Sequence, residues 1–179
     1  ASRAVTLDDR ACTVGVLVQG NYGQREDLLV DGVPVGRELG GATKANGERD
    51  GSVIVTIATD APLSDRQLGR LCRRGMLGLA RTGAVARHLS GDLLIAFSNA
   101  PENRVKRGDR SLLRTTVLLN DEHIDPMFVA TVEATEEAVL NALVAAETMS
   151  GRDGRVVEAI SHERLVDVMR RHGRLRHDP

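Results

Sequence analysis

One serine stands at the junction between a glycine-rich loop and a strand-like apolar run. The loop covers residues 36–51 and ends in Asp50-Gly51, and Ser52 opens the run SVIVTIATD. If the Gly51–Ser52 peptide bond broke, Ser52 would carry a free α-amino group, and its reference pKa of about 7.7–8.0 leaves part of it neutral near pH 7. Such an amine can act as base for the hydroxyl of the same residue, so one residue can supply nucleophile and base. The ordinary alternative is that Gly-Ser merely ends a loop.

Two further sets of polar groups could assist such a serine. Ser90 and Asp92 stand two residues apart at the start of a strand expected over residues 92–98. Residues at this spacing in extended backbone point to one face, so we expect the hydroxyl and the carboxylate side by side, able to orient a neighbouring hydroxyl. Asn21 follows a strand expected over residues 12–20, and its amide could stabilise an oxyanion. The alternatives are a turn cap for the first pair and a left-handed turn residue for Asn21.

Other chemistries lack their sequence signatures. Residues 40–44 (GGATK) have the wrong order for a Walker loop, and the chain has no GxGxxG opening a helix, no HExxH and no GxSxG. The five histidines show no metal-ligand spacing, and the two cysteines, Cys12 and Cys72, form no CxxC pair. We therefore expect no cofactor and no metal, and we interpret the cysteines as buried thiols.

Composition argues against nucleic-acid and membrane partners. Lys+Arg number 24 against 25 Asp+Glu, the net charge is -1, and aromatic residues make up 2% of the chain. A nucleic-acid surface would need excess positive charge or stacking platforms, and no apolar run approaches the roughly 18 residues of a membrane span. We expect a cytoplasmic protein, with the periplasm as the alternative. Because the chain begins with Ala1, we also expect a processed chain or a fragment.

The 179 residues suit one domain in which strands and helices alternate, which predicts an α/β layered fold. The almost continuous β-branched run over residues 53–58 predicts a central strand buried on both faces, and residues 93–96 have the same character. A further strand is predicted over residues 112–119, and helices are predicted over residues 127–149 and 161–172.

A capping box marks the start of the first long helix. Ser64 is a good N-cap and Gln67 lies three residues later. Gly83 is the expected residue after the helix end. Gly75 and Gly78 inside this helix cost stability relative to alanine, which predicts close packing against a neighbouring element.

Five segments, in order, resemble the L-aminopeptidase/D-esterase family, which includes D-stereospecific and β-peptidyl aminopeptidases. The specific feature is GSVIV followed by ATDAPL, with SGD downstream. The segments are TVGVLVQGNYG (13–23), VPVGREL (33–39), residues 50–83, SGDLLIAFSNA (90–100) and residues 133–160.

The resemblance implies a fold and a set of roles. It implies an αββα sandwich of the ornithine-acetyltransferase type and a precursor that cuts itself between Gly51 and Ser52. Residues 1–51 would then end an α chain with its processing loop, and residues 52–179 would form the β chain. Ser52 matches the nucleophile, Ser90 and Asp92 match the family's catalytic group, and Asn21 matches an oxyanion-hole residue.

The resemblance also implies partners. Family precursors are roughly twice this length, so we expect the family's N-terminal half to be absent here. A family oxyanion-hole tyrosine would lie in that half, and we do not assign its role to Tyr22. The expected partners are a small peptide or amide substrate, the remainder of the α chain, and further copies in a homo-oligomer of αβ units.

The leading hypothesis is therefore a self-processing aminopeptidase or amidase that forms an acyl-enzyme on Ser52 and releases N-terminal residues from small peptides, amides or esters. One alternative is an acyltransferase of the ornithine-acetyltransferase type, in which an amine accepts the acyl group. Another is a non-catalytic partial domain. The sequence does not specify a preference for L-, D- or β-amino acids.

Overall fold

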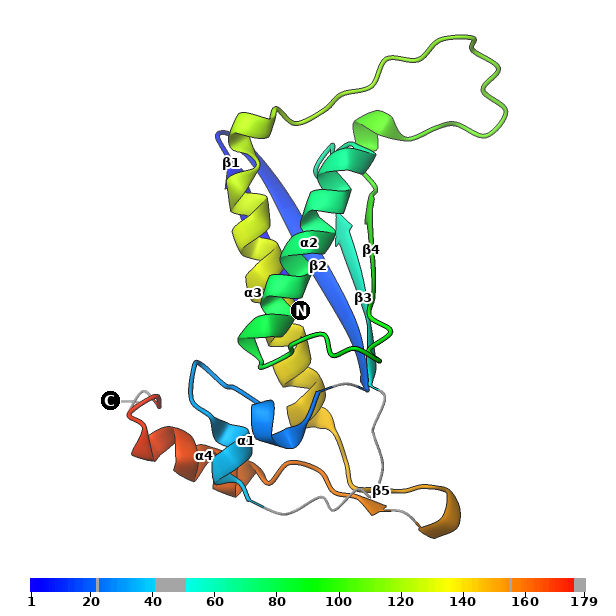
Figure 1. Ribbon diagram of the computed structural model, residues 1–179. Helices are drawn as coiled ribbons and strands as arrows, with labels where there is room; N and C mark the ends of the chain where they lie inside the picture. Colours follow the sequence, from blue (N-terminus) through cyan, green and yellow to red (C-terminus); the bar gives the residue numbers. More distant parts are fainter. Residues whose placement is uncertain (22, 41–50, 155, 176–179) are drawn as a thin grey trace.

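The main element of the computed structural model is a four-stranded mixed sheet. The structure describes residues 1–21, 23–40, 51–154 and 156–175 (Figure 1). The strand order is β1-β2-β3-β4; β1 and β3 both pair antiparallel with β2, and β4 pairs parallel with β3. The strands are β1 (Ser2–Leu7), β2 (Arg10–Asn21), β3 (Ser52–Thr59) and β4 (Leu93–Ser98). The prediction of an α/β fold is thus confirmed, whereas β1 was not predicted.

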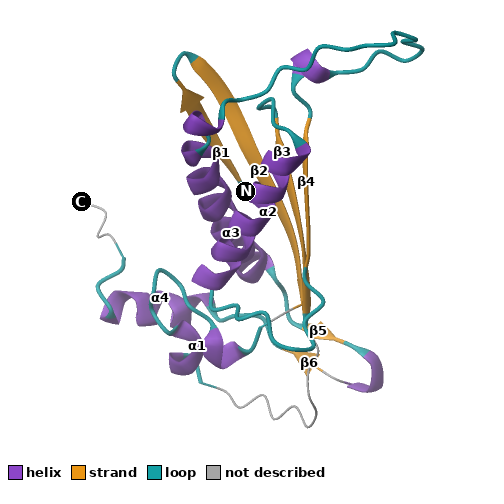
Figure 2. Cartoon of the chain, turned by 45° about the horizontal axis from the view of Figure 1, so that its top comes forward, coloured by secondary structure: helices purple, strands orange, loops and turns teal. Residues whose placement is uncertain are grey.

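Two long helices, α2 (Asp65–Arg81) and α3 (Asp125–Ala145), lie on one face of this sheet (Figure 2). Helix α2 makes the crossover between the parallel strands β3 and β4. It begins at the predicted capping box, in which the Gln67 N–H donates to Ser64 Oγ (3.3 Å) and the Ser64 N–H donates to Gln67 Oε1 (2.9 Å). Gly83 follows its end with a φ of 93°, as predicted. Helix α3 starts earlier and ends earlier than the predicted 127–149.

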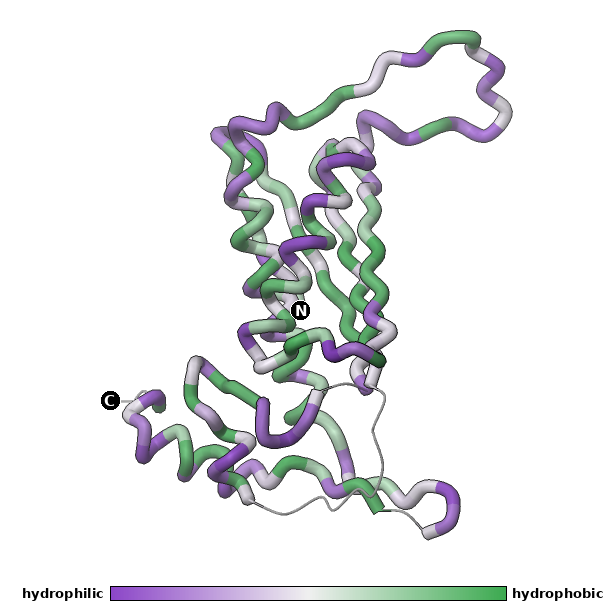
Figure 3. Tube along the Cα trace, in the orientation of Figure 1, coloured by the Kyte–Doolittle hydropathy of each residue, from purple (hydrophilic) through white to green (hydrophobic). Residues whose placement is uncertain are grey.

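The hydrophobic core lies between the sheet and these helices. Strands β3 and β4 are hydrophobic along most of their length (Figure 3). On the inner face of β3, Val53, Val55 and Ile57 are at most 1% exposed. The prediction that residues 53–58 and 93–96 are buried on both faces is wrong for the described structure, because both long helices cover the same face. The large side chains exposed on the outer face are Leu17, Ile54, Leu93, Ile95 and Phe97.

The two glycines inside α2 allow the close packing that the sequence predicted. A Cβ atom added to Gly78 would lie 2.6 Å from both the Val132 carbonyl oxygen and Thr135 Cβ in α3. One added to Gly75 would lie 2.8 Å from the side chain of Leu94 in β4. Contact with backbone cannot be relieved by a side-chain rotation, so Gly78 sets how closely α2 approaches α3.

A smaller cluster forms below the sheet, where η1 (Arg25–Asp27), α1 (Val35–Glu38) and α4 (His162–Arg171) gather (Figure 1). Hydrogen bonds from Arg171 and His172 lower the pKa of Glu38 and join α1 to α4. Because α1 covers Val35–Glu38, the predicted loop 36–51 begins with helical residues. Its residues 41–50 lie outside the described residues. The apolar residues of the cluster are Val33, Val35, Leu39, Val168 and Met169.

The remaining connections contain short elements: η2 (Pro101–Asn103), η3 (Asp121–His123), β5 (Met149–Ser150), η4 (Arg152–Gly154) and β6 (Val156–Val157). The strand predicted over residues 112–119 is absent from the described structure. That segment belongs to a long loop that extends away from the sheet (Figure 1), and Leu112 is 95% exposed. Its apolar residues suited a strand, but strand structure also requires a paired neighbour.

Replacement of Gly78 by alanine should destabilise the protein by about 1–3 kcal/mol, because the added methyl group collides with the α3 backbone. Gly69 lies in the same helix, but a Cβ atom added there meets nothing within 4 Å. The matched control Gly69→Ala should therefore stabilise by about 0.5–1 kcal/mol through helix propensity. Urea unfolding of both variants measures the change in the free energy of unfolding. If both substitutions changed it by the same amount in the same direction, the packing argument would be contradicted.

Candidate active site

The residues singled out from the sequence gather at one end of the sheet, where β2 ends and β3 and β4 begin. Asn21, the last residue of β2, lies opposite Ser52, the first residue of β3. In the parallel β3–β4 pair, Ile54 lies opposite Leu93. The same register continued two residues back brings Ser52 beside Gly91.

The hydroxyl of Ser52 has a defined contact. The Gly91 backbone N–H donates a hydrogen bond to Ser52 Oγ over 3.2 Å. A Cβ atom added to Gly91 would lie 3.0 Å from this oxygen, so the position favours glycine. The Ser52 side chain is otherwise exposed on the outer face of the sheet. The Ser52 hydroxyl is therefore exposed on this face and accepts a hydrogen bond from one backbone donor.

Asn21 lies on the same face as Ser52. Directly opposed residues of an antiparallel pair project to one side of the sheet with Cβ atoms about 4.5–5.5 Å apart. Both residues are exposed. The side chains of Asn21 and Ser52 are thus neighbours on the outer face of the sheet.

Ser90 and Asp92 form the side-by-side pair that the sequence predicted. Ser90 Oγ donates to Asp92 Oδ1 over 2.6 Å, and both residues are half-buried. Together with Gly51 they line a small cavity of about 40 Å³. Within the described part of the chain, neither side chain hydrogen-bonds to Ser52 Oγ. The pair thus lies near the Gly51 backbone, not against the hydroxyl.

Sequence reasoning missed an ion pair that joins the loop before β4 to η1. Arg87 Nη2 contacts Asp27 Oδ2. Close packing adjoins it, because a Cβ atom added to Gly83 would lie 1.8 Å from the Asp27 carbonyl oxygen. These contacts join the loop that follows α2 to η1. No signal in the sequence indicated a pair 60 residues apart in the chain.

The site offers a hydroxyl, an amide, a carboxylate and backbone N–H groups. Within residues 1–21, 23–40, 51–154 and 156–175, no group of three or more His, Cys, Asp or Glu side chains could hold a metal ion. In the same ranges, no helix is long and apolar enough to cross a membrane.

An exposed serine stands at the first position of an inner strand of the α/β sheet, with an amide opposite it and a backbone donor on its Oγ. This arrangement defines a candidate serine-nucleophile enzyme. The model of Peptidase family S58 matches residues 1–157. The chain belongs to this family, as its resemblance to the L-aminopeptidase/D-esterase family indicated.

Curated relatives agree with this assignment. The chain is 40% identical over 189 residues to the β-peptidyl aminopeptidase BapA of Sphingosinicella microcystinivorans, covering 98% of this chain and 47% of that protein. It is likewise 40% identical to BapA of Sphingosinicella xenopeptidilytica, covering 95% of this chain and 45% of that protein. The chain therefore spans about half the length of the curated relatives that it matches.

Solved structures share the fold. The PH0078 protein of Pyrococcus horikoshii OT3 superposes with a TM-score of 0.86 at 48% identity, over 98% of this chain and 47% of that one. The L-aminopeptidase D-Ala-esterase/amidase of Ochrobactrum anthropi is described as a variant of the Ntn hydrolase fold. It superposes with a TM-score of 0.85 at 41% identity, over 98% of this chain and 48% of that one. A β-aminopeptidase of Burkholderia sp. superposes with a TM-score of 0.78 at 41% identity, over 97% of this chain and 48% of that one. Two of these three neighbours are thus aminopeptidases, and one of the two is described as a variant of the Ntn hydrolase fold.

Replacement of Gly91 by alanine should lower the reactivity of Ser52, because the added methyl group displaces the hydroxyl from its backbone donor. A misplacement of this size costs about 10- to 100-fold in rate. The rate of modification by a serine-directed sulfonyl fluoride, followed by intact mass, measures the effect. Gly15→Ala is the control, since a Cβ atom there meets only the Ala58 carbonyl oxygen at 3.9 Å. If the Gly91→Ala variant were modified at the wild-type rate, Gly91 would have no role in positioning the Ser52 hydroxyl.

Proposed function

We propose that this chain carries the nucleophile of a self-processing serine aminopeptidase or amidase that releases N-terminal residues from small peptides, amides or esters. The observation that carries the proposal is the placement of Ser52 at the first position of β3, with Asn21 opposite and the Gly91 N–H on its Oγ. Membership of Peptidase family S58 and the similarity to β-peptidyl aminopeptidases support it.

The first step of the proposal is cleavage of the chain itself. Ser52 Oγ attacks the Gly51 carbonyl carbon, the C–N bond breaks, and the hydroxyl proton passes to the Ser52 nitrogen. Water then hydrolyses the resulting ester between Gly51 and Ser52 Oγ. This leaves a carboxylate on Gly51, which ends the α chain at residue 51, and a free α-amine on Ser52, which begins the β chain.

The second step uses the freed residue on substrate. The α-amine of Ser52 takes the proton from its own Oγ as that oxygen attacks the substrate carbonyl. The Asn21 amide donates to the developing oxyanion. The proton passes to the leaving amine or alcohol, and water hydrolyses the acyl-enzyme to regenerate the hydroxyl.

In this scheme Ser90 and Asp92 act on the nitrogen of Ser52. The Asp92 carboxylate accepts the Ser90 hydroxyl hydrogen, which turns the lone pairs of Ser90 Oγ outward as acceptors. Both side chains share a cavity with Gly51, whose bond to Ser52 yields the α-amine. Ser90 can therefore accept from this amine and hold it in place, while Asp92 balances the positive charge of its protonated form.

We further propose that the remainder of the α chain covers the outer face of the sheet and completes an αββα sandwich of the ornithine-acetyltransferase type. The exposed apolar side chains support this, because soluble proteins rarely leave a contiguous apolar sheet face open to water. The curated relatives are about twice as long as this chain, which leaves enough residues for a second sheet. The αβ units would then associate as a homo-oligomer.

Replacement of Ser52 by alanine should abolish both chain cleavage and hydrolysis, lowering kcat by more than about 10⁴-fold. The same oxygen attacks in both steps, so the two activities disappear together. Intact mass of the protein and turnover of a panel of amino-acid p-nitroanilides measure them. Ser52→Cys is the control, because it keeps a nucleophile and a potential α-amine and should retain measurable cleavage. Turnover by Ser52→Ala would disprove the assignment.

Ser90→Ala and Asp92→Asn should each lower kcat by at least tenfold while leaving the unfolding midpoint nearly unchanged. Loss of a group that acts mainly in the transition state lowers kcat more than it raises KM. Asp65→Asn, at the exposed start of α2, is the control for loss of a carboxylate. If either site variant keeps the wild-type kcat, that residue is a turn cap.

A further inference from the structure

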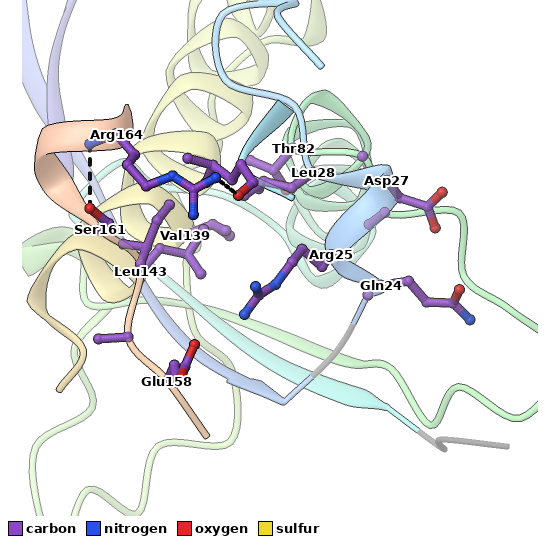
Figure 4. A pocket seen from close by; sticks show the side chains of 16 residues that line it. Gln24, Arg25, Asp27, Leu28, Thr82, Val139, Leu143, Glu158, Ser161 and Arg164 are labelled. Atoms are coloured by element: carbon purple, nitrogen blue, oxygen red, sulfur yellow. Dashed lines mark hydrogen bonds between the residues drawn. The ribbon is translucent and has the colours of Figure 1, made fainter. Parts of the chain in front are cut away.

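A second, larger cavity lies below the sheet on the side of the helices. Its volume is about 270 Å³, and it is enclosed by η1, the end of α3 and the segment that leads into α4 (Figure 4). Its apolar wall is built from Leu28, Val139, Leu143 and Ile160. This volume lies near the lower end of the range for ligand pockets, about 300 Å³, so the cavity suits only a small ligand.

Two arginines bring positive charge to this cavity from separate elements, Arg25 from η1 and Arg164 from α4 (Figure 4). Arg25 Nη1 donates to the Gly40 carbonyl oxygen over 3.3 Å, and Arg164 Nη2 donates to the Leu39 carbonyl oxygen. Neither guanidinium pairs with a carboxylate within the described residues. Because a guanidinium has five N–H donors, each keeps donors for a ligand.

The negative groups in the cavity wall do not cancel this charge. Asp27 is paired with Arg87, and Glu158 makes no ion pair within the described ranges. Among the described residues that line the cavity, two guanidiniums therefore stand against one carboxylate without an ion pair. A ligand that adds one negative charge to an apolar body would match both the charge and the wall, since carboxylates bind guanidinium groups through paired hydrogen bonds.

We propose that this cavity binds a small carboxylate with an apolar body, such as the C-terminal residue of a short peptide. It shares the lining residues Gly23, Gln24, Asp27, Gly83 and Ala84 with the small cavity beside Gly51, so it adjoins the candidate active site without containing it. The proposal does not depend on Ser52 as nucleophile, because the cavity recognises the carboxylate and the side chain of the ligand and not a scissile bond.

Calorimetric titration of the intact gene product with N-acetylleucine and N-acetylleucinamide tests this site. The two probes have the same body and differ in the carboxylate, and neither has the free amine on which the proposed aminopeptidase acts. We expect the acid to bind at least about tenfold more tightly than the amide. Arg25→Gln and Arg164→Gln should each weaken binding of the acid about tenfold, as for loss of a charged hydrogen bond.

Two further variants make the test specific. Glu158→Gln should tighten binding of the acid about two- to fivefold, because it removes a like charge at an exposed position. Arg37→Gln, on α1 and outside the cavity lining, is the matched control and should leave binding unchanged. Equal affinity for acid and amide, or undiminished binding of the acid in both arginine variants, would overturn the proposal. Neither result bears on Ser52, whose role is tested by chain cleavage.

Discussion

The hydrogen-bond register of β3 against its two neighbours is the constraint on which the candidate site depends. Asn21, Ser52 and Gly91 meet because β2 ends where β3 begins and because the β4 register continues back to Gly91. A slip of one residue in β3 would turn Ser52 to the helix side of the sheet and replace it on the outer face by Val53 or Gly51. The position of Ser52 is therefore a property of the whole ladder and not of the loop that precedes it.

Contacts at the far end of the ladder resist such a slip. Thr59 Oγ1 donates to the Thr13 carbonyl oxygen, and the Thr13 N–H donates to Asp60 Oδ1, each over 2.7 Å. These bonds are made by Thr59 and Asp60, about 23–26 Å along the strand from Ser52. The burial of Val53, Val55 and Ile57 in the core on the helix side has the same effect, because a shifted register would expose them. Packing on the helix side of the sheet thus fixes the position of Ser52 on the opposite face.

Local features of the sequence predicted local structure well. Two of these features depend on residues within a few positions of each other: the capping box of Ser64 and Gln67 and the Ser90–Asp92 hydrogen bond. The third, the close packing at Gly78, depends on the size of one side chain. Burial of both faces of β3 does not hold within the described residues, because β-branched composition reports strand preference and not which part of the protein covers each face. The Gly91 donor and the Arg87–Asp27 pair could not be predicted, since both depend on a register and a loop path that no short pattern encodes.

The polar groups of the candidate site lie in two environments. Ser52 Oγ and Asn21 lie on the outer face, among apolar side chains that the described part of the chain leaves exposed, whereas Ser90 and Asp92 are half-buried beside Gly51. An amide that donates to an oxyanion in bulk water gains little, because water competes as a donor and the high dielectric weakens the interaction. On the proposed mechanism, the same cover that removes Leu17, Ile54 and Leu93 from water would also lower the dielectric around Ser52 and Asn21. Closure of the outer face and activation of the nucleophile would then be one event, and the apolar residues of that face would contribute to catalysis without touching the substrate.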